Sequence, residues 1–361
     1  MAMIARNPAT GENIAEYDET KPAEVVAAIE TAHQAHLEWR RTPYSHRAGL
    51  MTRAAEILRE RAREFGELMT REMGKPIGGG VAEAEKCAWV CDYYAENAEE
   101  FLADQEVDTD ASRSFVTFQP LGTVLAVMPW NFPFWQVFRF AAPNLMAGNA
   151  GLLKHASNVP GCAVAIEEVF QQAGFPQGLF RTLLIPGSRV DAVIEHPLVR
   201  GVTLTGSTPA GKAVASKAGD VLKKTVLELG GSDPYVILED ADLDSAASTC
   251  ATARLINSGQ SCIAAKRFIV PARIRDAFEE RFVSAMAAAK MGDPMDGDTV
   301  VGPQAREDLR DELHDQVVRS LEAGARCVLG GEIPEGPGAF YPATVLTDVR
   351  PGTPAYSEEL F

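Results

Sequence analysis

The chain has 361 residues, of which 46% are hydrophobic and 23% are charged, and this composition excludes a disordered or collagen-like protein. Fifty acidic residues against 34 basic residues give a formal net charge of −16. This acidity argues against nucleic acid as a partner, because the chain as a whole repels phosphate. The same acidity fits either a halophilic source or a bias in codon composition.

The sequence carries no recognisable targeting signal. Residues 1–20 are polar and lack the apolar core of a secretory signal, and no apolar run is long enough to span a membrane. The six Cys form no CxxC pair and have no His at ligand spacing. We therefore expect a cytoplasmic protein with no membrane association and no metal site.

The first third of the chain is predicted to be helical. Pro22 begins a helix, and apolar residues recur at helical spacing over residues 45–72 and again over 80–101. Residues 107–119 alternate polar with apolar side chains around a polar tip. This pattern predicts a projecting hairpin.

From Thr123 onward the pattern alternates between strand and helix. Strands are predicted at 123–128, 150–154, 181–185 and 199–205, with helices at 134–148, 161–173 and 207–218. Such alternation is typical of an α/β fold with a parallel sheet. A second series has strands at 235–238 and 268–270 and helices at 243–258 and 273–291. We expect a domain boundary near Glu228, with one domain over 1–227 and another over 228–361.

Two Gly-containing segments lie at junctions where ligands commonly bind. Residues 205–211, with Gly206, Ser207 and Thr208, join a strand to a helix and expose backbone N–H groups that suit a phosphate. Close packing of the helix explains the same glycines equally well. Glu228 lies between two Leu residues, just before two Gly. An ionised carboxylate there must face a polar cavity, find a partner or take up a proton, unless Glu228 is a surface residue of an edge strand.

Cys262 follows a predicted helix, in a loop that contains Gly259. A single Cys is most simply a small buried hydrophobic residue. A loop position also gives the solvent access that a reactive thiolate needs, and a Glu could serve as its base.

Considered together, the motifs around Asn131, Lys154, Ser207, Glu228 and Cys262 occur in the order found in the aldehyde dehydrogenase superfamily. The chain resembles that family from about residue 7 to residue 361. The resemblance implies a parallel-sheet dinucleotide domain, an α/β catalytic domain and a hairpin at 107–119 that serves oligomerisation.

The resemblance also implies the catalytic roles. Cys262 matches the nucleophile that attacks the aldehyde, and Asn131 matches the donor that stabilises the oxyanion together with the Cys262 backbone N–H. Glu228 matches the general base that activates water to hydrolyse the thioester.

The cofactor implied by the resemblance is NADP, or alternatively NAD. Many NAD-preferring members carry Glu three residues after the matching Lys, whereas this chain carries Ser157, which removes repulsion of a 2′-phosphate. The full set matching cofactor-binding positions is Trp130, Asn131, Lys154, Ser157, Gly206, Ser207, Thr208, Leu229 and Glu359.

For the substrate, Trp135 and Arg139 share a helix face after Asn131, and Ser261 precedes Cys262. An Arg suits a carboxylate, so a small aldehyde with a distal carboxylate is expected. Residues 152–160 resemble the succinate-semialdehyde dehydrogenase branch. Arg139 could instead be a surface helix charge paired with an acid.

Three alternatives remain open at this stage. One is a dehydrogenase for another aldehyde, such as glutarate semialdehyde or a non-acidic aldehyde; another is a CoA-acylating enzyme, against which Glu228 argues. The third is a truncated, inactive chain that binds a nucleotide. Family members continue beyond the motif at Glu359 to Phe361, so we expect an incomplete catalytic domain, with weak or no turnover and poor oligomer order from residues 1–361 alone. At full length we expect a homodimer or homotetramer.

Overall fold

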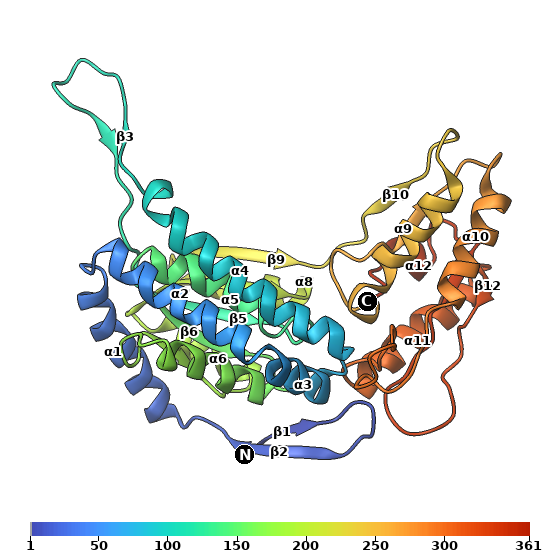
Figure 1. The fold of residues 1–361 in the computed structure, drawn as a ribbon, viewed down its shortest axis with the longest axis horizontal. Helices are drawn as coiled ribbons and strands as arrows, with labels where there is room; N and C mark the ends of the chain where they lie inside the picture. Colours follow the sequence, from blue (N-terminus) through green and yellow to red (C-terminus); the bar gives the residue numbers. More distant parts are fainter. Residues whose placement is uncertain (1) are drawn as a thin grey trace. The chain divides into compact units, whose positions relative to one another are not determined.

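The computed structural model describes residues 2–361, which form two compact units (Figure 1). The first unit comprises residues 2–5, Ala15–Gly66 and Val81–Leu229. The second comprises Arg6–Ile14, Glu67–Gly80 and Gly230–Phe361. The functional assignment of residues 1–227 and 228–361 to a dinucleotide domain and a catalytic domain stays a prediction.

The first unit is built around a five-stranded, all-parallel sheet, which confirms the predicted α/β class. Its strands are β5 (Thr123–Met128), β6 (Ala150–His155), β7 (Phe180–Thr182), β8 (Val199–Gly206) and β9 (Lys224–Leu229). The strand order is β7-β6-β5-β8-β9, so the direction of winding reverses between β5 and β8. Ligands of open parallel sheets bind at such a reversal, outside the carboxyl ends of the strands.

Helices connect the parallel strands. These helices are α5 (Trp135–Met146), α6 (Pro160–Gln172) and α8 (Thr208–Asp220), and η1 (Gly187–Arg189) and α7 (Val190–Glu195) precede β8. Strand β6 is buried along its whole length, as expected for a strand covered on both faces. The aromatic rings of Phe134, Phe138 and Phe170 pack in succession. The ring centroids are 6.4 Å apart for Phe134 and Phe138 and 5.2 Å apart for Phe138 and Phe170.

The N-terminal helices are α1 (Pro22–Trp39), α2 (Tyr44–Glu60), α3 (Ala62–Met73) and α4 (Ile77–Phe101). The single helix expected over 45–72 is therefore two helices. The break falls at Arg61, whose φ of −108° and ψ of 16° are not helical. Its guanidinium pairs with Glu64 in the first turn of α3, which helps to begin the next helix.

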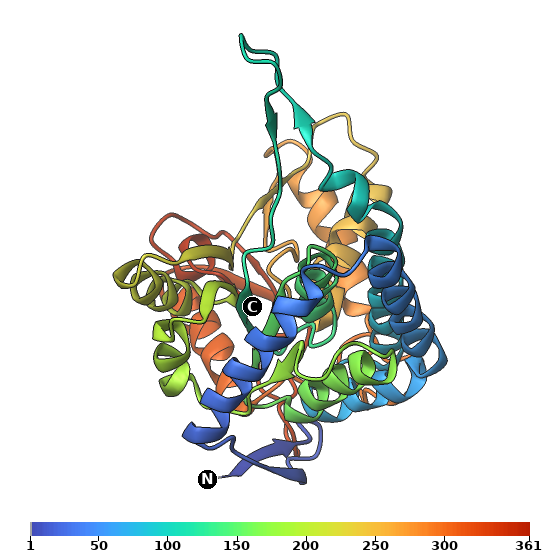
Figure 2. The same cartoon turned by 90° about the vertical axis from the view of Figure 1, so that its left-hand side faces the viewer.

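Two small antiparallel sheets accompany these helices. Strands β3 (Gln105–Glu106) and β4 (Phe115–Val116) pair at the base of a long loop that extends beyond the end of α4 (Figures 1 and 2). The paired strands thus start slightly before the hairpin predicted at 107–119. Strands β1 (Ala2–Arg6) and β2 (Asn13–Asp18) form a two-stranded sheet that the sequence analysis did not predict.

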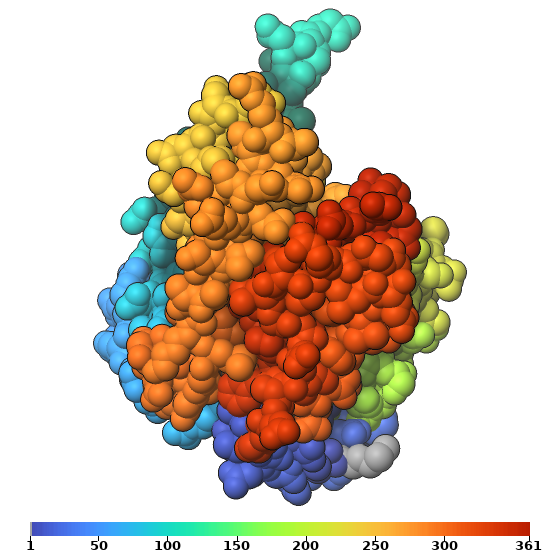
Figure 3. All heavy atoms as spheres, turned by 90° about the vertical axis from the view of Figure 1, so that its right-hand side faces the viewer, coloured from blue at the N-terminus to red at the C-terminus, as the bar shows by residue number. Residues whose placement is uncertain are grey.

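The second unit pairs β10 (Pro234–Val236) in parallel with β11 (Arg267–Ile269). Helices α9 (Leu243–Leu255) and α10 (Arg275–Ala287) pack together, and Phe278 and Phe282 lie in the buried cluster that includes both. The remaining elements, which the sequence analysis did not predict, are η2 (Ile256–Gly259), α11 (Glu307–Glu322), β12 (Arg326–Leu329), β13 (Val345–Thr347) and α12 (Pro354–Ser357). Figure 3 shows one face of this unit, drawn in yellow to red. Over residues 2–361, no helix has the length and hydropathy that crossing a bilayer requires.

Candidate active site

The carboxyl edge of the parallel sheet brings together most of the residues predicted for the first unit. Trp130 and Asn131 follow β5, Lys154 lies near the end of β6, and Ser207 follows β8. Glu228 is the penultimate residue of β9. Because parallel strands end at the same edge, these side chains share one side of the sheet, next to the reversal of strand order.

Two buried side chains hold the loop that carries Asn131. Glu83 of α4 accepts hydrogen bonds from the backbone N–H groups of Phe134 and Trp135, both at 2.9 Å, at the start of α5. His155 of β6 contacts the Pro133 carbonyl oxygen through Nε2 at 2.9 Å. These contacts lie at residues 133–135, just after Asn131, which is itself 5% exposed. The segment that follows Asn131 is therefore held by polar groups from other elements.

His155 is a neutral hydrogen-bonding group in this arrangement. Burial lowers the pKa of His155 to about 4, although the hydrogen bond to Pro133 opposes this shift. Its Nδ1 accepts from the backbone N–H of Ala156 at 2.8 Å, so Nε2 carries the proton and donates to Pro133. Neither His155 nor Glu83 was predicted to have a role from the sequence.

Lys154 is a buried cation without a counter-charge. It is 8% exposed, and burial lowers its pKa below the ordinary value of 10.5. Over residues 2–361, no carboxylate pairs with its ammonium. An unpaired buried cation at the carboxyl edge of a sheet fits an anionic ligand, since burial of a charge is costly unless a partner compensates it. Ser157, three residues further on, is exposed.

The start of α8 offers a second place for an anion. The Ser207 side chain accepts a hydrogen bond from the Ala210 N–H and caps the helix, while Thr208 is the first helical residue. Gly206 ends β8 just before the cap. Gly211 lies so close to Leu229 that a Cβ there would come within 2.5 Å of its side chain. The Leu229 side chain therefore packs on α8, and the Gly allows this close approach of helix and strand.

Arg139 lies beside Glu228 at the sheet edge. The Arg139 Nη2 atom is 3.9 Å from Glu228 Oε2 and 3.4 Å from Thr205 Oγ1. Both charged residues line a hollow of about 510 Å³, as does Gln136, which the sequence analysis did not single out. Trp135 is outside this lining, and its ring carries the Lys86 ammonium at 4.0 Å from the ring centroid. Trp135 and Arg139, which were predicted to share a helix face, thus lie in two different environments.

The loop before Cys262 has an unusual backbone. Asn257, Ser258 and Gly259 have φ values of 53°, 57° and 82°, so three successive residues adopt the left-handed conformation. The helix expected to reach Ser258 accordingly ends at Leu255. Left-handed conformations of residues other than Gly are strained, and they persist only where surrounding contacts hold them.

Such contacts are present in the second unit. Ser258 Oγ accepts from the Gly302 N–H at 2.9 Å. Gln260 is 1% exposed, and its Oε1 accepts from the Ala305 N–H at 2.9 Å. Asn257 Nδ2 donates to the Gln260 carbonyl oxygen at 3.0 Å. These hydrogen bonds therefore hold the backbone of residues 257–260, which precede Cys262 in the sequence.

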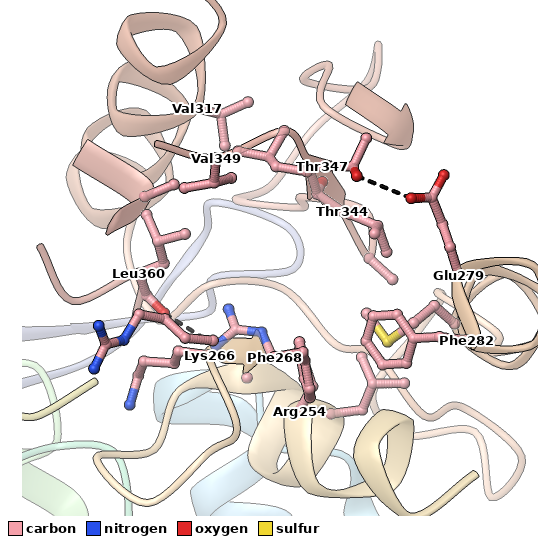
Figure 4. Close-up of a pocket in the computed structure, with 18 of the residues that line it drawn as sticks. Arg254, Lys266, Phe268, Glu279, Phe282, Val317, Thr344, Thr347, Val349 and Leu360 are labelled. Atoms are coloured by element: carbon pink, nitrogen blue, oxygen red, sulfur yellow. Dashed lines mark hydrogen bonds between the residues drawn. The ribbon is translucent and has the colours of Figure 1, made fainter. Parts of the chain in front are cut away.

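Cys262 itself is partly exposed, whereas its neighbour Ser261 is 1% exposed. The Ser261 hydroxyl has no hydrogen-bond partner over residues 2–361. Lys266 and Glu359 form an ion pair of 3.1 Å beside this loop. Neither Lys266 nor Arg254, whose hydrogen bond to the Leu360 carbonyl oxygen measures 3.0 Å (Figure 4), was predicted from sequence. Lys266 could have been found from the sequence, because it is a Lys that follows apolar residues shortly after Cys262.

The predicted residues thus fall into two groups. Ser261, Cys262 and Glu359 lie together in the second unit, and the other predicted site residues lie in the first. The roles given to individual residues remain predictions.

Comparison with known proteins matches the Aldehyde dehydrogenase family over residues 2–361. A probable NADP-dependent succinate-semialdehyde dehydrogenase from Synechocystis sp. is 52% identical over 361 residues, covering 100% of this chain and 80% of the relative. A succinate-semialdehyde dehydrogenase (NADP) from Mycolicibacterium paratuberculosis is 51% identical over 365 residues, covering 100% and 77%.

Solved structures are also similar. The succinic semialdehyde dehydrogenase of Streptococcus pyogenes, in complex with NADP+, has a TM-score of 0.97 and 37% identity, with 99% of this chain and 79% of that chain covered. A lactaldehyde dehydrogenase has a TM-score of 0.96 and 33% identity, covering 100% and 76%.

Proposed function

Because this chain belongs to the aldehyde dehydrogenase family, we propose that it oxidises succinate semialdehyde to succinate with NADP. The names of the Synechocystis and Mycolicibacterium relatives support both the substrate and the cofactor. The observation on this chain that carries the proposal is a guanidinium, that of Arg139, in a hollow of about 510 Å³ next to Glu228. A hollow of this size suits a small ligand, and a guanidinium suits its carboxylate.

In the proposed reaction, the Cys262 thiolate attacks the aldehyde carbon and forms a thiohemiacetal. The Asn131 amide and the Cys262 backbone N–H stabilise the oxyanion without supplying a competing acid. After hydride has left, a thioester joins the substrate to Cys262. Glu228 takes a proton from water, the resulting hydroxide attacks the thioester, and succinate leaves as the thiolate is regenerated.

The residues of the sheet edge fit a phosphorylated dinucleotide. When bound, NADP supplies an acceptor for the hydride of the aldehyde carbon. We assign its 2′-phosphate to Lys154 and Ser157, because no carboxylate among the described residues pairs with the buried Lys154 ammonium. Its pyrophosphate is assigned to Ser207 and Thr208 at the start of α8, the positive end of the helix dipole.

A substitution tests the cofactor assignment directly. Ser157→Glu places a carboxylate where the 2′-phosphate is expected, so kcat/KM for NADP should fall roughly 10-fold or more while that for NAD changes less. The measurement is steady-state oxidation with each cofactor in turn. Equal losses for both cofactors would contradict the assignment of Ser157.

The substrate proposal is tested by a panel of aldehydes. Succinate semialdehyde, glutarate semialdehyde, lactaldehyde and the uncharged butanal are each mixed with enzyme and NADP, and formation of NADPH is followed. We expect succinate semialdehyde to have the highest kcat/KM. A higher value for lactaldehyde would favour the second candidate function, which the similar lactaldehyde dehydrogenase structure suggests. Product analysis with and without coenzyme A separates hydrolysis from acyl transfer, and a CoA ester would contradict the role of Glu228.

We further propose that the β3–β4 hairpin mediates a homo-oligomer. Phe115 and Val116 are 43% and 47% exposed, and Phe118 is 41% exposed, so the hairpin presents apolar side chains. Exposed apolar residues on short strand edges favour pairing with another chain. Light scattering of Phe115→Asp beside the wild-type chain tests this proposal, and an unchanged molecular mass would contradict it.

A further inference from the structure

A cluster of buried charges lies behind the nucleophile loop of the second unit. The Lys266 side chain is only 1% exposed and forms its ion pair with Glu359 at 3.1 Å. Arg254 also approaches Glu359, and its guanidinium lies near Lys266 in Figure 4. The cluster thus holds two cations and one carboxylate, which leaves a net positive charge close to Cys262.

Lys266 uses its remaining hydrogens on the backbone of the nucleophile loop. Its Nζ donates to the carbonyl oxygens of Ser261 and Cys262, both at 2.9 Å. The ion pair with Glu359 at 3.1 Å adds a third contact. These three contacts hold the buried ammonium in place, and with it the loop to which it is bonded.

This contact also sets the direction of a backbone donor. In a trans peptide, the carbonyl of Ser261 and the N–H of Cys262 point in opposite directions. The Ser261 oxygen faces Lys266, so the Cys262 N–H faces away from it. Over residues 2–361, no hydrogen bond engages that N–H. It is left free for the oxyanion that the proposed reaction forms.

Lys266 also has a charge interaction with the Cys262 side chain. Burial lowers the pKa of Lys266, whereas its interactions with Glu359 and the charge of Cys262 raise it, and Arg254 lowers it. The interaction with Cys262 is mutual, because a nearby cation favours a thiolate. The other cationic neighbour in sequence, Arg267, is directed to the Ser232 carbonyl oxygen at 2.7 Å.

We propose that Lys266 is a positioning residue for the nucleophile: its ammonium fixes the loop that carries Cys262 and favours the thiolate form of that side chain. The inference deepens the proposed function and rests on the nucleophilic role of Cys262. Glu359 tunes the effect, since its carboxylate offsets part of the positive charge.

The test measures alkylation of Cys262 by iodoacetamide as a function of pH, with neither aldehyde nor dinucleotide present. The thiolate displaces iodide and forms a C–S bond, and peptide mass mapping identifies the modified Cys. In Lys266→Met the inflection should rise by about one pH unit, with roughly 10-fold slower alkylation near neutral pH. In Glu359→Gln the inflection should fall, because the charge of Lys266 is no longer offset.

The two substitutions are expected to shift the inflection in opposite directions. A general loosening of the loop would instead shift the inflection of both variants in the same direction. Lys290→Met is the matched control, because Lys290 is exposed and pairs with Asp298 at 2.7 Å in the same unit. Its profile should match that of the wild-type chain. Lys266→Arg keeps the charge and should keep the inflection of the wild-type chain.

An unchanged profile in folded Lys266→Met would overturn the proposal. If Lys266→Met does not fold, Glu359→Gln decides: a lowered inflection supports the proposal, and an unchanged or raised one overturns it. Because no substrate is used, these outcomes are independent of whether the enzyme oxidises succinate semialdehyde.

Discussion

The sheet edge of the first unit and the Cys262 loop of the second unit position their residues in different ways. At the sheet edge, regular parallel strands end together and deliver Asn131, Ser207 and Glu228 by topology. In the Cys262 loop, three left-handed residues and a buried ammonium hold an irregular backbone. The first kind of site is set by periodic local pattern, and the second by contacts between residues distant in sequence.

Loss of the thiol should give the largest effect and should leave the sheet edge intact. Cys262→Ala should reduce turnover by about 10⁴-fold or more, because the covalent bond cannot form. NADP binding, measured by calorimetry, should remain nearly unchanged. Cys327→Ala is the control, since Cys327 is also partly exposed in the second unit. Turnover of Cys262→Ala near the wild-type rate would end the thioester mechanism.

Removal of the proposed base affects the sheet edge instead. Glu228→Gln should lower steady-state turnover by roughly 10²–10⁴-fold, the range for loss of a general base. A rapid-mixing experiment should still show a burst of about one NADPH per site, because acylation precedes the step that needs Glu228. Glu195→Gln, an exposed surface variant in the same unit, should behave as wild type. Absence of the burst would instead give Glu228 a role in activating Cys262.

Arg139 provides a finer test of the same edge. Arg139→Ala should reduce kcat/KM for succinate semialdehyde. The reduction should correspond to a loss of roughly 1.5–3 kcal/mol of transition-state stabilisation, the range for a hydrogen bond to a charged group. The loss for butanal should be much smaller, since butanal has no carboxylate. Arg53→Ala, at an exposed pair with Glu56, is the control. Equal losses for both aldehydes would make Arg139 a structural partner of Glu228.

The last test concerns stability rather than catalysis. The pKa of His155 is about 4 when folded, below its ordinary value of 6.5. The unfolded chain therefore binds a proton that the folded chain does not between pH 6.5 and pH 4. The stabilisation is complete above pH 6.5 and is lost as the pH falls through this window, by about 3 kcal/mol in total.

Urea unfolding at several pH values measures this dependence. His155→Gln cannot titrate, so its free energy of unfolding should fall less steeply with decreasing pH than that of the wild-type chain. Parallel curves for the two proteins would show that His155 does not supply the pH dependence. A decrease in kcat without a change in KM for His155→Gln would in addition support its hold on the Asn131 loop.

The contrast between the two regions also explains what sequence could predict. Strands at 123–128 and 199–205 were predicted to within a residue of β5 and β8, because buried parallel strands are continuous apolar runs bounded by turns. The carboxyl edge follows from that alternation. Glu83 and His155 escaped prediction, since their partners lie up to 52 residues away in sequence.

The Cys262 loop was harder to predict for a related reason. The helix was predicted to continue to Ser258, but the backbone turns left-handed from Asn257, where Gly302 and Ala305 donate hydrogen bonds to Ser258 and Gln260. No local pattern encodes those partners. After residue 291, β12, β13 and α12 are only three or four residues long, which is too short to show a period, whereas α11 is 16 residues long and was missed although its pattern is helical.

Gly230 has a consequence that extends beyond its own backbone. A Cβ at this position would lie 1.9 Å from Glu359 Oε2, so the carboxylate occupies the space that any other residue would need. A side chain at position 230 would therefore displace Glu359 and release Lys266 from its ion pair. The space available to a side chain at position 230 thus depends on residue 359, although the two positions are far apart in the chain. In an alignment of relatives, positions 230 and 359 should consequently covary, with a larger residue at 230 appearing only where residue 359 is shorter than Glu.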